Sequence, residues 1–282
     1  FTKTWHSAPY PYLDPTKPSN TAEGKTVLIT GGGKGIGKEI ALTFAKARAR
    51  AIVIIGRTET SLLKAKSEIE LEAAAPNSLT IHAIVADISD AHSVKAAFSI
   101  VKSEVGLIDI CVQNAGYLDQ TKPVVQSSLD DYWRSFEINV KGGVIITQEF
   151  LNGAAAENAT LINITSGAAH LAPEVIPAYS AYSASKLALF RIMEFVNVEN
   201  PSLRVFNLQP GAIATDMAKK SGRPTRDDIT LPAAWCVWAA ASQEADFLRG
   251  RFVWANWDVT ELLDRKAEIL EHNLLSLAIS GL

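Results

Sequence analysis

The chain has 282 residues, of which 48% are apolar and 20% are charged, and its net charge is -3 at neutral pH. This length can bury a large core without metal or disulfide cross-links. The slightly acidic balance provides no basic surface for nucleic acid. Five scattered histidines and two cysteines, Cys111 and Cys236, predict no metal site, and we expect both thiols to be buried and free.

The chain also lacks the patterns of membrane and secreted proteins. No apolar run approaches the ~18 residues that would indicate a membrane span. The N-terminal stretch has no signal-peptide pattern. We therefore expect a cytoplasmic protein with neither membrane nor nucleic-acid partners.

Residues 1–24 contain four of the twelve prolines and no sustained periodicity. This composition predicts an extended N-terminal arm that lies on the surface or on a partner. Residues 25–282 are expected to form a single catalytic domain that binds a dinucleotide.

In that domain, short β-branched runs alternate with longer helical stretches. Strands are predicted at residues 26–30, 51–55, 79–86, 108–113, 159–165, 203–209 and 251–255. Helices are predicted after the first strand, where Ile36, Ile40 and Phe44 share a face, and at 61–75, 91–105, 129–152 and 182–198. Strands that are apolar on both faces indicate a parallel sheet covered by helices on each side. The expected fold class is therefore α/β, a doubly wound (Rossmann-like) sheet whose binding crevice lies at the carboxyl ends of the strands.

The first strand runs into a glycine-rich loop, TGGGKGIGKEIA, from Thr30 to Ala41. Its G-x-x-x-G-x-G spacing between a strand and a helix favours a site where backbone amides and the helix dipole hold a pyrophosphate. Gly32 to Lys38 also fits part of a nucleoside-triphosphate loop, but Glu39 then stands where Ser or Thr should ligate magnesium. A purely structural glycine turn is the third alternative.

The second strand ends in Arg57, about 20 residues after the glycines, where a NAD site usually has an acid for the ribose hydroxyl. A guanidinium group suits a 2'-phosphate instead, so NADP is favoured, with Lys34 as a second cation. An exposed arginine at a strand end is the simpler alternative.

The stretch YSAYSASK, residues 179–186, places two tyrosines near one lysine. Residues four apart share a helix face, so Tyr182 can meet Lys186, whereas Tyr179 has Ser183 at that offset. An adjacent ammonium favours phenolate and should lower the pKa of Tyr182 from its usual value near ~10. Such a pair also arises by chance, so its weight depends on the rest of the chain.

With these motifs in place, residues 25 to about 257 resemble the short-chain dehydrogenase/reductase family, and NADP-dependent members in particular. The matching motifs follow the family's order: Thr30 to Gly37, Asp87, Asn114-Ala115-Gly116, Asn139, Ser166, Tyr182 with Lys186, and Pro210-Gly211 with Thr215. Both flanks, FTKTWHSAPYPYLDP and LRGRFVWANWDV, resemble a fungal branch, many of whose members act in secondary metabolism.

The resemblance implies a cofactor site. Asp87 would bind the adenine, Asn114 to Gly116 would brace the sheet beside the cofactor, and Thr215 would hold the nicotinamide amide. Asp87 could alternatively cap a helix, and residues 114–116 could form an ordinary turn. The expected cofactor-binding residues are Gly31, Gly33, Lys34, Gly35, Ile36, Gly37, Arg57, Thr58, Asp87, Ile88, Asn114, Ala115, Gly116, Tyr182, Lys186, Pro210, Gly211, Ile213 and Thr215.

The resemblance also implies four catalytic residues. Ser166 would hydrogen-bond the substrate oxygen while Tyr182 gives it a proton. Lys186 would lower the pKa of Tyr182 and hold the nicotinamide ribose, and Asn139 would anchor a water that relays protons. Ser166 as a strand-end cap and Asn139 as an ordinary helix residue are the structural alternatives.

Three features depart from the family pattern. Ser166 lies 16 residues before Tyr182, a longer spacing than usual, so Thr165 or Ser180 could compete for its role. The first crossover helix ends in KARARA without the usual glycine, and Gln113 stands where the family usually has Asn.

Together these expectations predict an NADPH-dependent reductase that converts a ketone to a secondary alcohol or runs the reverse oxidation. The reaction would need no metal. The substrate loops would be 117–128, 167–180 and 212–228, and residues 218–228 would be either a mobile lid or a plain solvated loop.

The expected pocket walls are Tyr117, His170, Leu171, Tyr179 and Met217, a mostly apolar set that suggests a hydrophobic or aromatic ketone. His170 could instead bond within its loop, and Tyr179 could be surface packing. The resemblance suggests a homodimer or homotetramer through the helices at 129–152 and 182–198.

Two other classes of function remain as alternatives. The same fold could run a non-redox reaction as a dehydratase, cyclase or epimerase, which product analysis without net NADPH consumption would reveal. A non-catalytic NADP-binding module would behave normally after Tyr182→Phe.

Overall fold

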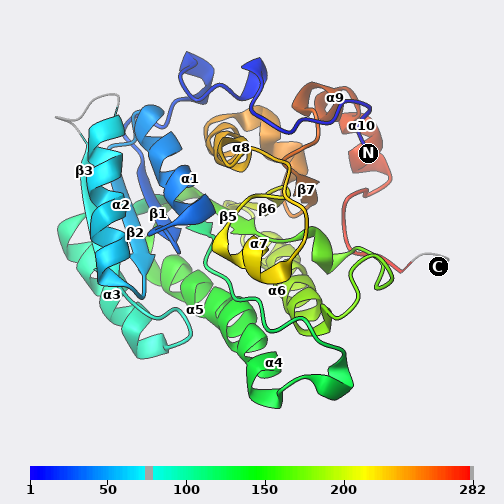
Figure 1. The fold of residues 1–282 in the computed structure, drawn as a ribbon. Helices are drawn as coiled ribbons and strands as arrows, with labels where there is room; N and C mark the ends of the chain where they lie inside the picture. The colour runs from blue at the N-terminus through cyan, green and yellow to red at the C-terminus, as the bar shows by residue number, and fades with distance from the viewer. Residues whose placement is uncertain (74–78, 280–282) are drawn as a thin grey trace.

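The computed structural model describes residues 1–73 and 79–279. Seven strands form one sheet in the order β3-β2-β1-β4-β5-β6-β7, and every neighbouring pair is parallel (Figure 1). The strands are β1 Thr26–Thr30, β2 Ala51–Gly56, β3 Thr80–Val85, β4 Ile108–Gln113, β5 Ala155–Ile164, β6 Arg204–Gln209 and β7 Phe252–Trp254. The order reverses between β1 and β4, which places a binding crevice at their carboxyl ends. The predicted doubly wound fold is confirmed.

Helices cover both faces of the sheet. One face carries α1 Gly35–Lys46, α2 Glu59–Glu72 and α8 Thr230–Ala241, and the other carries α3 Ala91–Glu104, α5 Gly142–Glu149 and α6 Ser180–Glu199. Each face has its own buried core: Phe44 and Trp235 lie in the first, and Phe98 and Met193 in the second. The remaining helical elements are η1 Pro11–Leu13, η2 Pro18–Asn20, η3 Val124–Gln126, α4 Leu129–Phe136, η4 Glu137–Lys141, η5 Phe150–Ala154, η6 Gly167–Ala169, α7 Asp216–Ser221, η7 Gln243–Leu248, α9 Val259–Asp264 and α10 Lys266–Glu271.

Several element boundaries differ from the predictions. The helix expected at 61–75 begins at Glu59, and its last two predicted positions, 74 and 75, lie outside the described residues. The helix expected at 182–198 begins at Ser180. Strand β5 begins at Ala155, earlier than residue 159, because Ala155 pairs with Ile108 beyond a shift in register. These shifts leave the topology unchanged.

The helix expected at 129–152 is present but is not a uniform α-helix. A π-helical turn, η4, separates α4 from α5, and a second, η5, ends the run. Asn139 lies in the first of these turns. Single π-helical turns inside α-helices are often found at functional sites.

The turn after α1 closes without a glycine, as the KARARA segment requires. Arg48 takes the left-handed conformation, with φ of 69°, that glycine usually adopts there. The Ala49 amide donates to the Phe44 carbonyl at 3.0 Å, which satisfies an otherwise free helix end.

The N-terminal segment, residues 1–24, contains short helical turns as well as extended chain. Two of its prolines start the 3-10 turns η1 and η2, because the fixed φ of proline suits a first helical position. Leu13, Asn20 and Ala22 are buried, so the second half of the segment packs into its own domain. In Figure 1 the dark-blue chain passes over α8 and reaches α9 and α10.

Two further expectations concern the buried core and the membrane. Cys111 and Cys236 are free and buried, as predicted. In the described part of the chain, no helix combines the length and the apolar character needed to cross a bilayer.

Candidate active site

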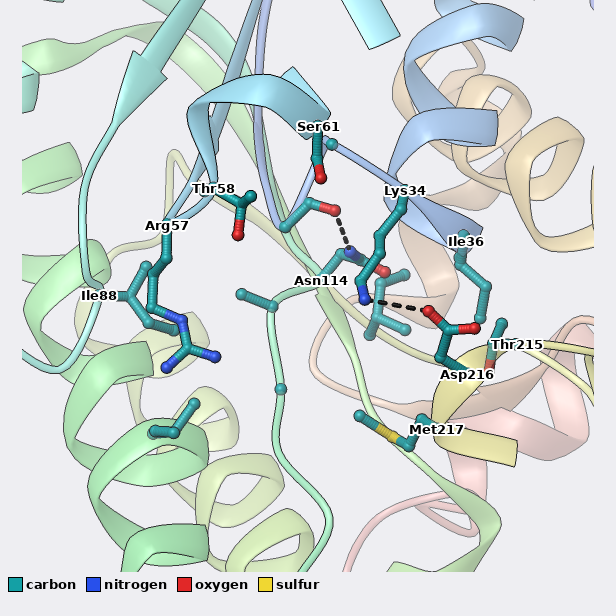
Figure 2. Close-up of a pocket in the computed structure, with 18 of the residues that line it drawn as sticks. Lys34, Ile36, Arg57, Thr58, Ser61, Ile88, Asn114, Thr215, Asp216 and Met217 are labelled. Carbon is teal, nitrogen blue, oxygen red and sulfur yellow. Dashed lines mark hydrogen bonds and ion pairs between the residues drawn. The ribbon is translucent and has the colours of Figure 1, made fainter. Parts of the chain in front are cut away.

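A cleft of about 570 Å³ opens at the carboxyl ends of the central strands. Figure 2 shows Arg57 and Thr58 on one side of this cleft and Lys34, Thr215 and Asp216 on the other. Expected cofactor residues that line it are Gly31, Gly33, Lys34, Gly35, Ile36, Arg57, Thr58, Asp87, Ile88, Asn114, Ala115, Gly116, Tyr182, Lys186, Pro210 and Thr215. Gly37, Gly211 and Ile213 are near the cleft in sequence but do not line it.

The glycine loop has the conformation that its spacing suggests. Gly31 and Gly35 have φ of 68° and 56°, a region that glycine enters without strain. Helix α1 begins at Gly35, and the preceding Lys34 side chain does not cap it. Gly35 and Ile36 line the cleft, and no described side chain caps the amides of this first turn, which suits an anionic group at this helix N-terminus.

Gly37 and Gly211 serve packing rather than the cleft surface. A Cβ on Gly37 would lie 2.4 Å from Asn114 Nδ2 and 2.4 Å from the Gly31 carbonyl oxygen. Asn114 Nδ2 donates to the Thr30 carbonyl at 3.0 Å, so this close approach joins the loop to the end of β4. Gly211 has φ of 101°, and a Cβ there would meet the Asp227 carboxylate at 2.9 Å. Both glycines thus shape the cleft through packing, and their contact with the cofactor stays a prediction.

The two cations expected to bind the 2'-phosphate, Arg57 and Lys34, differ in whether they already have a partner. Arg57 is exposed at the end of β2, and its side chain forms no hydrogen bond or ion pair with other described residues. Lys34 pairs with Asp216 at 3.0 Å, which lowers the pKa of the Asp216 carboxyl (Figure 2). Lys38, which a triphosphate loop would need, pairs with Glu68 and does not line the cleft. Arg57 is thus the cation most available to an anionic ligand here.

Asp87 lines the cleft after β3 and is held by its own turn. Its carboxylate accepts hydrogen bonds from the Ser89 amide at 2.9 Å and the Ser89 hydroxyl at 2.7 Å. Burial raises the pKa of Asp87, but these bonds outweigh burial and leave the pKa below its usual value. The group therefore presents a fixed carboxylate to the cleft.

Tyr182 and Lys186 both line the cleft from α6. The Lys186 nitrogen lies 6.0 Å from the centre of the Tyr182 ring and donates to the Ile164 carbonyl at 2.8 Å. Burial lowers the pKa of Lys186 to about 8. Burial also raises the pKa of Tyr182 to about 12, and the nearby Ser166 hydroxyl only partly opposes this. The net pKa of Tyr182 is therefore above its usual value and not below it as expected, because desolvation of the phenolate dominates.

Asn139 lies beside Lys186, but its side chain is fully engaged with protein atoms. Its Oδ1 accepts from the Tyr117 amide at 2.7 Å, and its Nδ2 donates to the Tyr117 carbonyl at 2.8 Å and to Ser185 Oγ at 2.9 Å. A Cβ on Gly116 would lie 3.3 Å from Asn139 Oδ1 and 3.4 Å from Lys186 Nζ. The side chain of Asn139 therefore anchors the loop after β4 next to the lysine.

Ser166 follows β5, close enough to Tyr182 to lower the pKa of that phenol. Its hydroxyl also accepts from the Ala168 amide at 3.2 Å and so caps η6. The catalytic role and the capping role proposed for Ser166 are thus compatible. Neither Ser166 nor Ser180 lines the cleft, whereas Thr165 lines it but is buried.

Apolar side chains gather beside the Tyr182 ring. Tyr179, Leu171 and Met217, three of the expected pocket walls, pack in one cluster with Tyr182, together with Leu118 and Ile176. The other two expected walls lie elsewhere. The Tyr117 hydroxyl donates to Asp131 at 2.5 Å, and the Arg134 guanidinium carbon and the Lys220 nitrogen lie 5.1 and 4.8 Å from the centre of its ring. His170 packs edge-on against Phe252 and accepts from Trp254 Nε1 at 3.1 Å.

The sequence reasoning missed several residues of the site. Leu118 and Ile176 sit inside predicted substrate loops, where their apolar character was a usable signal. Ser61 and Leu62 line the cleft from the first turns of α2, one turn after Arg57. Asp216 directly follows Thr215, but its pairing with Lys34 joins residues 182 positions apart and has no local signal.

Comparisons with known proteins agree with this geometry. The family model for short chain dehydrogenases matches residues 25–226. The short chain dehydrogenase pigC of Monascus ruber is 33% identical over 97% of this chain and 92% of its own length. A short chain dehydrogenase/reductase of Claviceps purpurea is 34% identical over 95% of this chain and 90% of its own.

Solved structures show the same fold. A short chain dehydrogenase of Shigella flexneri complexed with NADP superposes with a TM-score of 0.75 at 21% identity, over 84% of this chain and 99% of that one. An alcohol dehydrogenase of Thermococcus sibiricus complexed with 5-hydroxy-NADP gives a TM-score of 0.71 at 25% identity, over 82% and 96%. The extent of the family match and the identity to its fungal members show that this chain belongs to the short-chain dehydrogenase/reductase family of oxidoreductases.

Proposed function

We propose that the protein is an NADPH-dependent reductase that converts a ketone to a secondary alcohol, with the reverse oxidation using the same groups. The observation that carries this proposal is that Tyr182 and Lys186 line the same cleft as the glycine loop and Arg57. A proton donor and a dinucleotide-binding loop in one cleft are what carbonyl reduction requires.

The residues of the cleft fit a phosphorylated dinucleotide. The amides at the start of α1 would hold the pyrophosphate, and Arg57, exposed and free of partners among the described residues, would face the 2'-phosphate. Asp87 would contact the adenine and Thr215 the nicotinamide amide. Two similar proteins of known structure carry NADP or a derivative of it, which supports the choice of NADP.

When bound, NADPH supplies the hydride for the carbonyl carbon. Tyr182 would donate its proton to the carbonyl oxygen, and its raised pKa keeps that proton in place at neutral pH. Ser166, next to Tyr182, would hold the same oxygen. Lys186, buried one helical turn after Tyr182, would stabilise the negative charge that forms on Tyr182 and hold the ribose. The Asn139 side chain would keep this lysine and the loop after β4 in place, and a water relay from Asn139 would have to use its main chain.

The substrate would enter over the loops 117–128, 167–180 and 212–228. The cluster of Leu118, Leu171, Ile176, Tyr179 and Met217 beside Tyr182 supports a hydrophobic or aromatic ketone. Such a wall removes apolar substrate surface from water, which favours binding by roughly 25 cal/mol for each Å² of apolar surface buried.

The test is a panel of aliphatic, aromatic and polar ketones incubated with the protein and NADPH. We expect NADPH oxidation matched by alcohol formation, fastest with apolar ketones. A product formed without NADPH consumption would instead indicate a dehydratase, cyclase or epimerase, and binding without any product would indicate a non-catalytic module.

We also propose that the protein forms a homodimer or homotetramer through the two helical regions at 129–152 and 182–198. Leu129 and Trp133 on α4, and Phe195 and Val198 on α6, are exposed apolar side chains. Light scattering of the wild type and of Phe195→Glu would test this, because a charge in an apolar interface should shift the protein toward the monomer.

A further inference from the structure

The N-terminal arm, residues 1–10, contacts parts of the chain that border the proposed substrate site. The family model begins at residue 25 and ends at residue 226, so the arm and most of the surface it covers lie outside the matched region. The arm is held by the region around α9. The Lys3 and Thr4 amides donate to the Glu261 carboxylate, His6 Nε2 lies 2.7 Å from an oxygen of Asp258, and the His6 carbonyl accepts from Asn256 Nδ2 at 2.8 Å.

Trp5 contacts Arg226 in one substrate loop and Trp254, which in turn contacts the other. Its backbone forms an antiparallel bridge with Trp257, and its ring lies 5.6 Å from the ring of Trp254. The guanidinium group of Arg226 lies 5.6 Å from the centre of the Trp5 ring. Two residues later in the arm, the Ser7 carbonyl accepts from the Asp228 amide at 2.7 Å.

The first set of contacts leads to the loop of Ser166. Trp254 donates to His170 at 3.1 Å, and its ring packs so closely on Gly167 that a Cβ there would lie only 3.0 Å from Cη2. Gly167 directly follows Ser166, and Leu171 of the apolar cluster packs on the same glycine. A change in the position of Trp254 would therefore displace Gly167, next to Ser166, and with it Leu171 of the pocket wall.

The second set leads to the loop after β6. The Arg226 amide donates to the Ala212 carbonyl at 2.9 Å, and the Asp227 carboxylate accepts from the Ala212 amide at 2.7 Å. Residues 226–228 thus clamp the start of the segment that carries Thr215 and Met217, both of which line the cleft. The arm contacts residues 226–228 through Trp5, which packs on Arg226, and through Ser7, which bonds Asp228.

We propose that Trp5 is a positioning residue: by packing on Trp254 and Arg226, it fixes the loops 167–171 and 212–228 around the substrate. The expected effect on kinetics rests on the proposed reductase function. The expected effect on loop order can be measured without any substrate. A loop displaced by about 1 Å can reduce the rate by as much as ~100-fold, because reacting groups must be held in a narrow geometry.

The experiment compares Trp5→Ala and Trp5→Phe with the control Tyr12→Phe. Tyr12 belongs to the same N-terminal segment, but its hydroxyl binds Glu244 and its ring packs near Trp238, away from both loops. Hydrogen–deuterium exchange would be followed peptide by peptide. Ketone kinetics and the Kd for NADPH would be measured in parallel.

For Trp5→Ala we expect faster exchange confined to residues 167–171 and 212–228. We also expect kcat/KM for the ketone to fall by about tenfold while the Kd for NADPH stays within about twofold of wild type. Trp5→Phe should restore most of the loss, since it keeps an aromatic face for Arg226 and Trp254, and Tyr12→Phe should match wild type.

Two results would overturn the proposal. One is wild-type exchange and kinetics in Trp5→Ala. The other is faster exchange across the whole sheet with a parallel loss of NADPH affinity, which would mean that Trp5 only stabilises the fold. If the wild type itself reduces no ketone, the proposed function fails, and the exchange data still decide whether Trp5 orders the loops.

Discussion

The Lys186 nitrogen faces the Tyr182 ring at 6.0 Å from its centre and is tied to the Ile164 carbonyl behind it. The described hydrogen bonds of the lysine nitrogen therefore include one to a backbone carbonyl and none to the phenol oxygen. A charge at this depth interacts more strongly than it would in water, but burial also makes the charged state harder to maintain. If the proposed function holds, the protonation states of these two residues set the pH range of activity.

We expect Tyr182→Phe to abolish reduction while leaving the Kd for NADPH nearly unchanged, because only the proton donor is removed. General acid catalysis typically contributes ~10²–10⁴-fold, so kcat should fall by at least about 100-fold. Tyr179→Phe is the matched control, since the Tyr179 hydroxyl only donates to the Ser221 carbonyl at 3.2 Å. Equal losses in the two variants would contradict the assignment.

The pH dependence of reduction should follow Lys186. Its pKa is lowered to about 8 by burial, so the ammonium is present below that pH and is lost as the pH rises through it. Tyr182, with a pKa of about 12, keeps its proton throughout this range. We therefore expect kcat/KM for the ketone, measured from about pH 6 to about pH 10, to be flat and then to fall above the lysine pKa. A profile that stays flat through this range would show that the charge on Lys186 is not needed.

Arg57→Asp should shift the cofactor preference from NADP toward NAD. A charge-assisted hydrogen bond is worth roughly 1.5–3 kcal/mol, so NADPH affinity should fall by at least about tenfold. NADH affinity should hold or rise, because an acid can accept from the ribose hydroxyl. Lys34→Met is the control with a smaller expected effect, since Lys34 is already paired with Asp216. Isothermal titration with both cofactors measures the ratio, and an unchanged ratio in Arg57→Asp would rule out contact with the phosphate.

Gly37→Ala should destabilise the protein and weaken cofactor binding together. The new methyl group would meet Asn114 Nδ2 and the Gly31 carbonyl oxygen at 2.4 Å, and neither the backbone nor the bonded amide can withdraw easily. Overpacking of this kind typically costs about 1–3 kcal/mol. Gly33→Ala is the control for stability, because a Cβ at Gly33 would lie 3.4 Å from its nearest neighbours, an ordinary van der Waals distance. Thermal unfolding that is equal in the two variants would contradict the packing role of Gly37.

Much of the cofactor half of the site was predictable because it depends on local geometry. The spacing of Gly31 and Gly35 sets a strand-loop-helix turn, and the offset of four residues sets Tyr182 beside Lys186 on one helix face. Runs such as residues 26–30 and 51–55 are apolar at every position, which only a sheet covered on both faces can bury. These patterns identified the parallel sheet and the side on which the cleft opens.

Two of the five expected pocket walls lie outside the apolar cluster beside Tyr182. His170 and Tyr117 lie in loops that a sequence can locate but whose side-chain directions are set by distant partners, Trp254 for the former and Asp131 for the latter. Likewise, the packing of the N-terminal segment on its own domain depends on Asp258 and Glu261, more than 250 residues away.

The sequence by itself determined the order of strands and helices, the glycine loop and the tyrosine and lysine, because each follows from backbone periodicity or from spacings of a few residues. Only the tertiary structure decided the pKa values of Tyr182 and Lys186, the pairing of Lys34 with Asp216 and the contacts of Trp5. Desolvation and long-range contacts depend on which surfaces the whole chain brings together, and no local spacing contains that information.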